Sequence, residues 1–247
     1  MTRDEGLERL AAAGLSDADA AVVVEHLVAA DAAGKHGHGL ARVPWLEGLL
    51  EGARDSRGAP VRVERGDGYE RWDGGRALGY LTLDAVCAGL QRDPPEHARL
   101  VVCGSCFPTG MLGGWARRIA GAGLVAVVTA TSPRRLPHPE GGPPLTGTNP
   151  IAIAVPASDG APLVADVSMG AVTHGDVLAG RARPEELVPF GAELAHKAFA
   201  LAVGVELLVG ALAGPEHGAV VLAARPEHDP VPAFRELAAG LRLPGDR

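Results

Sequence analysis

Three apolar runs of strand length constrain the fold of this 247-residue chain more than any other feature. They cover residues 100–103, 124–129 and 151–155, and turn-forming residues follow each of them. A helical pattern over residues 111–122 separates the first two runs. No GxGxxG segment opens a helix after a strand, so the Rossmann nucleotide fingerprint is absent from the sequence. The runs therefore predict a mixed α/β (α+β) fold of another type.

The remaining patterns suggest three segments. Residues 1–58 form an N-terminal helical segment, in which Ser16 is expected to cap the second helix. Residues 59–190 form a central α/β core, with a half-exposed strand over 61–65 and a Pro- and Gly-rich loop over 133–150 that is predicted to hold neither helix nor strand. Residues 191–247 form a helix–strand–helix unit that packs on the core and begins with a long apolar helix at 192–212.

Composition excludes several classes of protein. With 47% hydrophobic and 21% charged residues the chain is globular, and aromatic residues make up only 4%, so its core must consist of Val, Leu, Ala and Ile. A net charge of -7 without a block of five like charges is unfavourable for nucleic-acid binding. The charged N-terminus, the absence of an uninterrupted apolar run of 18 residues and the three cysteines predict a cytoplasmic protein that does not bind or span a membrane.

Two short motifs could carry chemistry. His36-Gly37-His38 follows a helix, and glycines beside a histidine allow a ligand to approach closely, so substrate or metal binding competes with a loop of solvated histidines. Cys103 and Cys106 form a CxxC pair that could be a redox dithiol, half of a zinc site or two small core residues. There is no second CxxC and no Hx3–5H motif, so no metal is assigned.

Polar residues also occur at strand ends. Thr148 and Asn149 precede the strand at 151–155, where they could bind a carboxylate or phosphate or could brace the turn. Asp166 and Ser168 place a carboxylate and a hydroxyl at alternate positions after another short apolar run. Lys197 lies on an otherwise apolar helix, so it must either extend to solvent or meet an anion.

In this order, the motifs resemble those of the malate/L-lactate dehydrogenase family of non-Rossmann NAD(P)-dependent oxidoreductases, which includes ureidoglycolate and sulfolactate dehydrogenases and cyclic-imine (Δ1-piperideine-2-carboxylate) reductases. The segment 147–152, Gly-Thr-Asn-Pro-Ile-Ala, matches the family's strand entry without change. The other similar segments are Gly37-His38-Gly39-Leu40-Ala41-Arg42, Asp73-Gly74-Gly75 with Leu78-Gly79, Ser105-Cys106-Phe107, Asp166-Val167-Ser168 and Ala195-His196-Lys197-Ala198-Phe199-Ala200.

The resemblance implies N-terminal helices, a mostly antiparallel sheet layered with helices, and an active site formed between the subunits of a homodimer. It implies that the substrate is a small carboxylate. It further implies roles for individual residues: His38, Cys106 and Arg42 in catalysis, Thr131, Asp166, Ser168 and Lys197 in NAD(P) binding, and His36, Gly37, Thr148 and Asn149 in substrate binding.

Several positions depart from the family. Cys106 occupies the place of the acid/base histidine, Gly37 replaces a serine, and Ala198 and Ala200 replace glycines beside Lys197. Parts of the family's cofactor-binding segments have no counterpart. Two functions therefore remain open: an NAD(P)-dependent oxidoreductase for a small keto, hydroxy or imino acid, or a descendant that has lost the cofactor and isomerises, cyclises, eliminates or binds a ligand in the same pocket. A metal-binding protein that uses His36, His38 and the CxxC pair is a third alternative.

Overall fold

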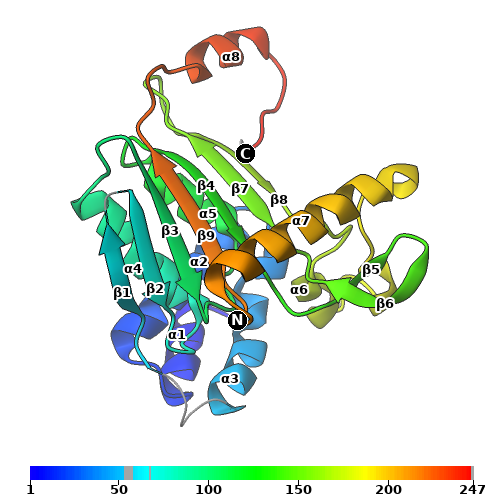
Figure 1. Ribbon diagram of the computed structural model, residues 1–247. Coiled ribbons are helices and arrows are strands. Elements are labelled where there is room, and N and C mark those ends of the chain that lie inside the picture. Colours follow the sequence, from blue (N-terminus) through cyan, green and yellow to red (C-terminus); the bar gives the residue numbers. More distant parts are fainter. Residues whose placement is uncertain (53–57, 67, 246–247) are drawn as a thin grey trace.

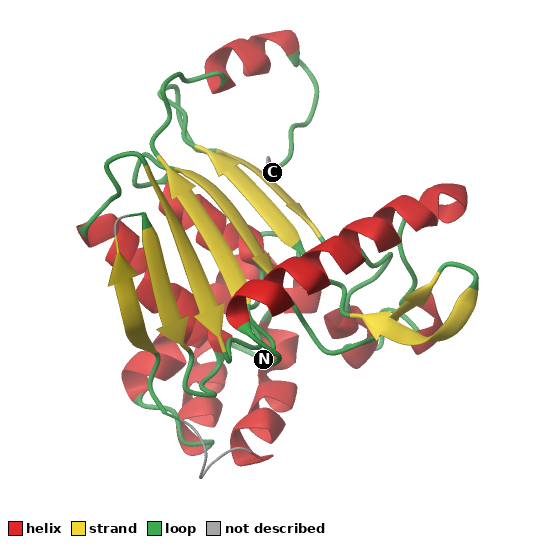
Figure 2. Cartoon of the chain, in the orientation of Figure 1, coloured by secondary structure: helices red, strands yellow, loops and turns green. Residues whose placement is uncertain are grey.

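The computed structural model describes residues 1–52, 58–66 and 68–245. A seven-stranded sheet forms its centre, in the order β1-β2-β3-β9-β4-β7-β8, and every neighbouring pair is antiparallel except β2 and β3 (Figures 1 and 2). This confirms the predicted mixed fold with a mostly antiparallel sheet. The strands are β1 (Val61–Gly66), β2 (Tyr69–Asp73), β3 (Ala98–Gly104), β4 (Val125–Ala130), β7 (Ile151–Val155), β8 (Leu163–Val167) and β9 (Ala219–Ala224).

Helices lie on both faces of the sheet, but they cover the faces unequally (Figures 1 and 2). One face carries α1 (Arg3–Ala12), α2 (Asp17–Ala32), α4 (Gly79–Arg92) and α5 (Leu112–Ala120), whereas α7 (Ala195–Ala213) crosses the other. The remaining helices are α3 (Val43–Gly52), α6 (His174–Leu178), α8 (Val231–Leu237) and the 3-10 turns η1 (His36–His38), η2 (Leu40–Arg42), η3 (Pro184–Glu186) and η4 (Ala192–Leu194).

Alternation along the strands divides the core between these two layers. Val101 of β3 and Val221 of β9 are buried beneath the larger helical layer, whereas Val102 and Val220 pack against Val209 of α7. On the face that packs against the larger helical layer, the strands present mainly Ala and Val side chains. These small side chains let the helices approach the sheet closely. The core consists mainly of Leu, Val and Ala, as the low aromatic content predicts, but it also contains Trp72, Tyr80 and Trp115.

Local signals in the sequence explain where the first helices begin. Thr2 and Glu5 form a reciprocal capping box at the start of α1. The Ser16 hydroxyl accepts a hydrogen bond from the Asp19 amide at 3.1 Å, which confirms the predicted cap of α2.

The prediction that residues 133–150 contain no strand is wrong. This segment holds β5 (Leu136–His138) and β6 (Gly141–Thr146), which form a separate two-stranded sheet. Its pairing is irregular, with register shifts around Pro137, because proline cannot donate a ladder hydrogen bond. The sequence pattern reads as a loop for the same reason.

The absence of a membrane-spanning segment stays a prediction from the sequence. By length and composition alone, one helix in the described part of the chain, over Ala192–Ala213, is apolar enough to cross a membrane. This helix contains no uninterrupted apolar run of 18 residues, because charged residues such as Glu206 lie within it. Most of this helix is exposed.

Candidate active site

A cavity of about 290 Å³, here called the site cavity, lies where the η1 segment, the end of β8 and α6 meet. Eight of the predicted site residues line it: His36, Gly37, His38, Arg42, Thr131, Thr148, Asp166 and Ser168. Cys106, Asn149 and Lys197 are not among the lining residues. Residues from distant parts of the sequence thus converge on one place.

The two histidines of the η1 turn differ sharply in environment. His36 is exposed, and its Nδ1 lies 2.9 Å from Oδ1 of Asp31. His38 is half-buried, but its Nδ1 is shielded from solvent and has no hydrogen-bond partner in the described part of the chain. Burial, followed by the positive charges of Arg42 and Lys35, lowers the pKa of His38 to about 3. Of the two alternatives for this loop, solvated histidines describe His36 but not His38, whose Nδ1 is shielded from solvent.

The glycine at position 37 allows η1 to pack against α6. A Cβ at Gly37 would lie 2.2 Å from the Thr173 hydroxyl oxygen, and a Cβ at Gly175 would lie 1.7 Å from the Gly37 carbonyl oxygen. Neither distance is possible for a real side chain, so both positions require glycine in this arrangement. The Thr173 hydroxyl occupies the space that a side chain at position 37 would need.

The site cavity is rich in cations. Lys35 Nζ donates to Asp166 Oδ2 at 2.7 Å and to the Asp166 carbonyl oxygen at 3.1 Å. Arg42 is only 7% exposed, its guanidinium lies 4.8 Å from the Trp45 ring centroid, and its Nε has no hydrogen-bond partner among the described residues. The carboxylate of Asp166 is therefore neutralised by Lys35, while Arg42 still has hydrogen-bonding capacity for an anion.

Arg135 and His174 were not predicted from the sequence. Arg135 lines the site cavity, and burial together with the charge of Arg42 lowers its pKa. Burial and the charges of Arg135 and Arg42 lower the pKa of His174 to about 4, so this imidazole is neutral at pH 7. One signal could have indicated His174: Thr173 and Asp176 form a Thr-x-x-Asp capping box that marks the start of α6.

Cys106 lies in the core. It is fully buried, and its Sγ is 3.7 Å from the Gly79 carbonyl oxygen. Cys103 is buried as well, and its pKa is raised well above the usual range by its hydrogen bond to Cys106 and by burial. Of the three interpretations of the CxxC pair, this placement fits small core residues. The described residues contain no cluster of three or more His, Cys, Asp or Glu side chains suited to a metal ion.

Asn149 braces the turn before β7. Its Nδ2 donates to the Ala202 carbonyl oxygen at 3.0 Å and to Glu206 Oε2 at 2.6 Å, and its Oδ1 accepts from the Ser132 amide at 3.3 Å. These bonds tie the turn to α7 and leave Thr148 at the site cavity. Thr131, which also lines the cavity, accepts a hydrogen bond from the Gly218 amide at 3.0 Å.

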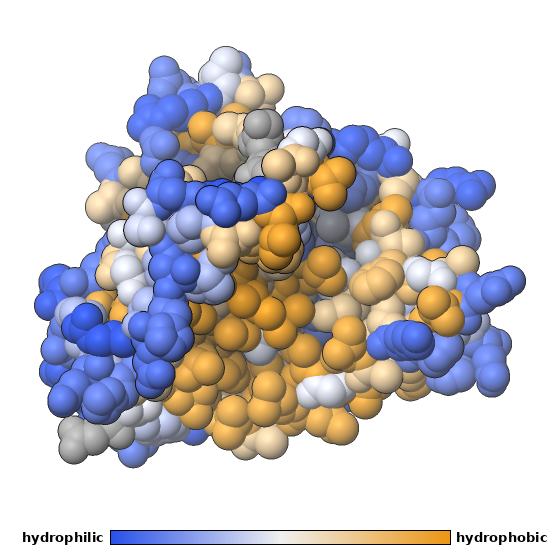
Figure 3. All heavy atoms as spheres, turned by 90° about the horizontal axis from the view of Figure 1, so that it is seen from above, coloured by the Kyte–Doolittle hydropathy of each residue, from blue (hydrophilic) through white to orange (hydrophobic). Residues whose placement is uncertain are grey.

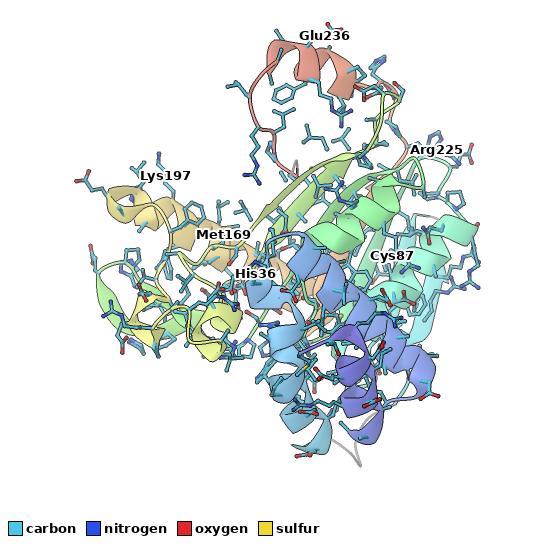
Figure 4. The ribbon with its side chains drawn as sticks, turned by 180° about the vertical axis from the view of Figure 1, so that it is seen from behind. His36, Cys87, Met169, Lys197, Arg225 and Glu236 are labelled. Atoms are coloured by element: carbon cyan, nitrogen blue, oxygen red, sulfur yellow. The ribbon has the colours of Figure 1, made fainter. Side chains whose placement is uncertain are left out.

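Lys197 is distant from these groups in the single chain. It lies in the first turn of α7, and Figure 4 shows its side chain projecting from the outer end of that helix, whereas His36 lies near the centre of the molecule. It extends to solvent, one of the two outcomes expected for a lysine on an apolar helix. Its role in cofactor binding remains a prediction from the resemblance.

The arrangement can bind a small organic acid and exchange a proton with it. Arg42 offers a guanidinium to a carboxylate, and neutral imidazoles of His38 and His174 line the same cavity. Thr131 and Ser168 add hydroxyl groups.

Known proteins show the same fold and related sequences. The chain is 30% identical to the (2R)-3-sulfolactate dehydrogenase (NADP(+)) of Chromohalobacter salexigens, over 85% of this chain and 69% of that protein. It is also 30% identical to a Delta(1)-pyrroline-2-carboxylate/Delta(1)-piperideine-2-carboxylate reductase of Pseudomonas syringae pv. tomato, over 81% of this chain and 66% of the reductase. The chain thus spans about two thirds of the length of these relatives.

Two solved structures extend the comparison. The Δ1-piperideine-2-carboxylate reductase from Pseudomonas syringae superposes with a TM-score of 0.83 at 25% identity, over 99% of this chain and 89% of that one. The malate dehydrogenase from Pyrococcus horikoshii OT3 superposes with a TM-score of 0.81 at 23% identity, over 98% and 81%, and shares the fold. A profile of the family described as malate/L-lactate dehydrogenase matches residues 3–192. The chain therefore belongs to the malate/L-lactate dehydrogenase family.

Proposed function

We propose that this protein is an NAD(P)-dependent oxidoreductase that interconverts a small 2-hydroxy acid and 2-oxo acid, or reduces the corresponding imino acid. The observation that carries the proposal is the site cavity, in which a buried arginine with a free Nε lies beside the half-buried imidazoles of His38 and His174. The names of the relatives support it, since they are a sulfolactate dehydrogenase, a cyclic-imine reductase and a hydroxycarboxylate dehydrogenase.

The residues present fit a dinucleotide cofactor. A second cavity of about 760 Å³ adjoins the site cavity and shares Lys35, Met111 and Asp166 with it. Thr131, Asp166 and Ser168 would hold the cofactor at the site cavity, and Gly113 and Gly114 of α5 line the second cavity. When bound, the reduced nicotinamide supplies a hydride to the carbonyl or imine carbon and leaves as NAD(P)⁺.

The balancing proton goes to the substrate oxygen or nitrogen, and we assign its transfer to a histidine of the site cavity. His38 and His174 both line the cavity, whereas Cys106 is enclosed by the core. A neutral imidazole accepts the proton when a hydroxy acid is oxidised. The positive charge of Arg42 disfavours the protonated form of both histidines, and an anion bound at Arg42 reduces this effect. The bound substrate therefore favours a protonated histidine, which can donate its proton when the oxo or imino acid is reduced.

Cofactor binding tests this proposal first. Titration with NADPH and with NADH, followed by nicotinamide fluorescence and by thermal shift, is expected to show saturable binding of at least one of them. Loss of absorbance of the bound cofactor on addition of oxaloacetate, pyruvate or Δ1-piperideine-2-carboxylate then identifies the substrate type. If neither cofactor binds at millimolar concentration, the oxidoreductase proposal is wrong.

We further propose that the exposed face of α7 is covered by a second copy of the chain. Leu207 is 67% exposed, and further exposed apolar side chains lie on α7 and on the same side of the sheet: Leu201, Leu208, Ile153, Val167 and Leu222. Figure 3 shows hydrophobic side chains gathered in one continuous area. Soluble monomers rarely expose apolar patches larger than roughly a few hundred Å², so a homodimer accounts for this surface.

The molecular mass in solution tests whether the protein is a dimer. Light scattering after size-exclusion chromatography is expected to give twice the monomer mass, and Leu207→Asp is expected to give the monomer. Leu237→Asp is the matched control, because Leu237 is exposed on α8 at a distance from α7. A monomer that floats with lipid vesicles would instead indicate that α7 contacts a membrane.

A further inference from the structure

We propose that Glu206 of α7 is a positioning residue of the site cavity, and that it acts through Asn149 on the turn that carries Thr148. The proposal rests on the proposed function, because it concerns the cavity in which the substrate would bind. Glu206 does not line this cavity, so it is not a catalytic residue. It holds in place a part of the wall that does.

Glu206 is an unusual residue for its helix. In α7, all of which the structure describes, it is the only acidic residue, and it lies between Val205 and Leu207. A half-buried carboxylate on such a helix needs hydrogen-bond donors. Its Oε2 accepts from Nδ2 of Asn149 at 2.6 Å and, more weakly, from the Gly147 amide at 3.5 Å. Both donors belong to the turn before β7, so the carboxylate is engaged by this turn.

Asn149 needs the support that Glu206 provides. It is fully buried, and its φ of 32° lies in the left-handed region, which residues other than glycine seldom adopt. Such a backbone persists only where its surroundings hold it. The Nδ2 protons of Asn149 go to Glu206 and to the Ala202 carbonyl oxygen at 3.0 Å, and its Oδ1 accepts from the Ser132 amide at 3.3 Å. The bond to the carboxylate is the shortest and is charge-assisted, so we expect it to be the strongest of the three.

The turn touches the wall of the site cavity on two sides. On one side, the carbonyl oxygen of Thr148 accepts a hydrogen bond from the Met169 amide at 2.8 Å, directly after Ser168. On the other side, Asn149 accepts from the amide of Ser132. Three of these residues line the cavity: Ser132, Thr148 and Ser168. A change in the turn is therefore expected to move groups that face the bound substrate.

Three variants separate the hydrogen bond from the charge. Glu206→Ala leaves one Nδ2 proton of the buried Asn149 without its acceptor, which loosens the turn. Glu206→Gln keeps an oxygen that can accept this proton. Glu25→Ala is the matched control, because the Glu25 carboxylate also lies on a helix and is 2.6 Å from Nε of Arg3, but it does not line the cavity. Thermal unfolding establishes that each variant is folded, and light scattering establishes that its mass is unchanged.

Amide hydrogen exchange, resolved by NMR, tests the positioning role without any ligand. The amides of Gly147, Ser132 and Met169 each donate to Glu206 or to the turn. Glu206→Ala is expected to raise their exchange rates by about 10-fold, because the turn opens more often. Glu206→Gln should raise these rates much less, and Glu25→Ala should leave them unchanged.

Steady-state kinetics then show whether the turn serves the substrate. The substrate is whichever of pyruvate, oxaloacetate and Δ1-piperideine-2-carboxylate the protein turns over. Glu206→Ala is expected to raise KM by about 10-fold and to change kcat by less than about 3-fold, since the cavity wall is displaced but the histidines remain. Glu206→Gln is expected to restore most of the affinity. A purely structural role would lower the melting temperature and leave KM unchanged.

Several results overturn the proposal. Unchanged exchange of the three amides in folded Glu206→Ala does so, as does an equal rise in Glu25→Ala or raised exchange with an unchanged KM. If Glu206→Ala does not fold, Asn149→Asp sets two carboxylates against each other and breaks the same bond. Adding Glu206→Gln to that variant should then slow the exchange again, and no recovery overturns the proposal. Failure of the proposed function is distinguishable, because it removes cofactor binding and turnover, whereas the exchange rates still decide whether Glu206 holds the wall.

Discussion

Lys35 and Asp166, which are 131 residues apart in the sequence, form an ion pair with Nζ 2.7 Å from Oδ2. The pair joins the end of the N-terminal helices to β8, the edge strand of the sheet. It also lies on the boundary between the site cavity and the adjoining cavity. A single contact therefore links two segments and shapes both cavities.

Lys35→Met is expected to reduce the free energy of unfolding by about 1 kcal/mol, because it leaves the largely buried Asp166 carboxylate without its cation. Urea unfolding measures this change. The chain has only one other lysine, Lys197, which is exposed on α7 and makes Lys197→Met the natural control. That control should change stability by less than about 0.5 kcal/mol. Equal losses in the two variants would show that the ion pair contributes nothing. The affinity of the same control for NADPH tests the cofactor role predicted for Lys197.

Substitution separates the possible proton-transferring residues. At least one of His38→Asn and His174→Asn is expected to lower kcat about 10²- to 10⁴-fold, since each removes an imidazole from the site cavity. Cys106→Ala should keep turnover close to that of the unsubstituted protein, because the thiol is enclosed by the core. Steady-state oxidation of NADPH gives the comparison. If Cys106→Ala abolishes turnover in a folded protein, the thiol takes part in the reaction after all.

Acid is expected to destabilise the protein through His26. This ring stacks on Trp115 at a centroid distance of 4.2 Å and accepts a hydrogen bond from the Met111 amide at 3.0 Å. Burial lowers the pKa of His26 from 6.5 to about 4. Between these values the unfolded chain binds the proton and the folded chain does not, so the stability is fully present above pH 6.5 and is lost as the pH falls toward 4.

The expected loss from this residue is on the order of 3 kcal/mol, and urea unfolding at a series of pH values measures it. His26→Gln should be less stable at neutral pH but should show a shallower decline below pH 6.5. His97→Gln is the control, because the His97 side chain is 92% exposed. A decline of unchanged slope in His26→Gln would assign the acid sensitivity to other groups.

Gly37 is expected to tolerate no side chain. Gly37→Ser restores the residue typical of the family, but its Cβ would meet the Thr173 hydroxyl, so we expect a loss of about 1–3 kcal/mol. Gly48→Ala in α3 is the control, since nothing lies within 4 Å of its added Cβ and alanine favours the helix by about 0.5–1 kcal/mol. Thermal unfolding is expected to show a lower melting temperature for Gly37→Ser and a higher one for Gly48→Ala. A Gly37→Ser variant as stable as the parent would mean that α6 moves aside freely.

Part of this fold can be predicted from the sequence because short apolar runs report directly on buried strands. They indicate β3, β4 and β7. They do not indicate β2, whose central segment contains Glu70, a buried carboxylate neutralised by Arg99 at 3.2 Å and Arg62 at 3.3 Å. Those partners come from neighbouring strands, so the burial of Glu70 depends on contacts that no local pattern contains.

The same distinction applies to the candidate site. The family motifs include His38, Arg42 and Asp166, which line the site cavity. Arg135 and His174 carry no motif of their own, and they reach the cavity through tertiary packing. His174 reaches the cavity because the backbones of η1 and α6 contact each other at Gly37 and Gly175. Only the assembled chain brings the two arginines to the same cavity.

The position of β9 has a consequence for how the chain can be made. β9 lies between β3 and β4, although about 90 residues separate it from β4 in the sequence. During synthesis, the strands β1, β2 and β3 and the strands β4, β7 and β8 therefore emerge as two half-sheets with open, apolar edges that cannot join until residue 224 has left the ribosome. The open strand edges of such a nascent chain must be kept from pairing with other chains for most of its translation. This risk of aggregation ends when β9 pairs with β3 and β4 and joins the two half-sheets.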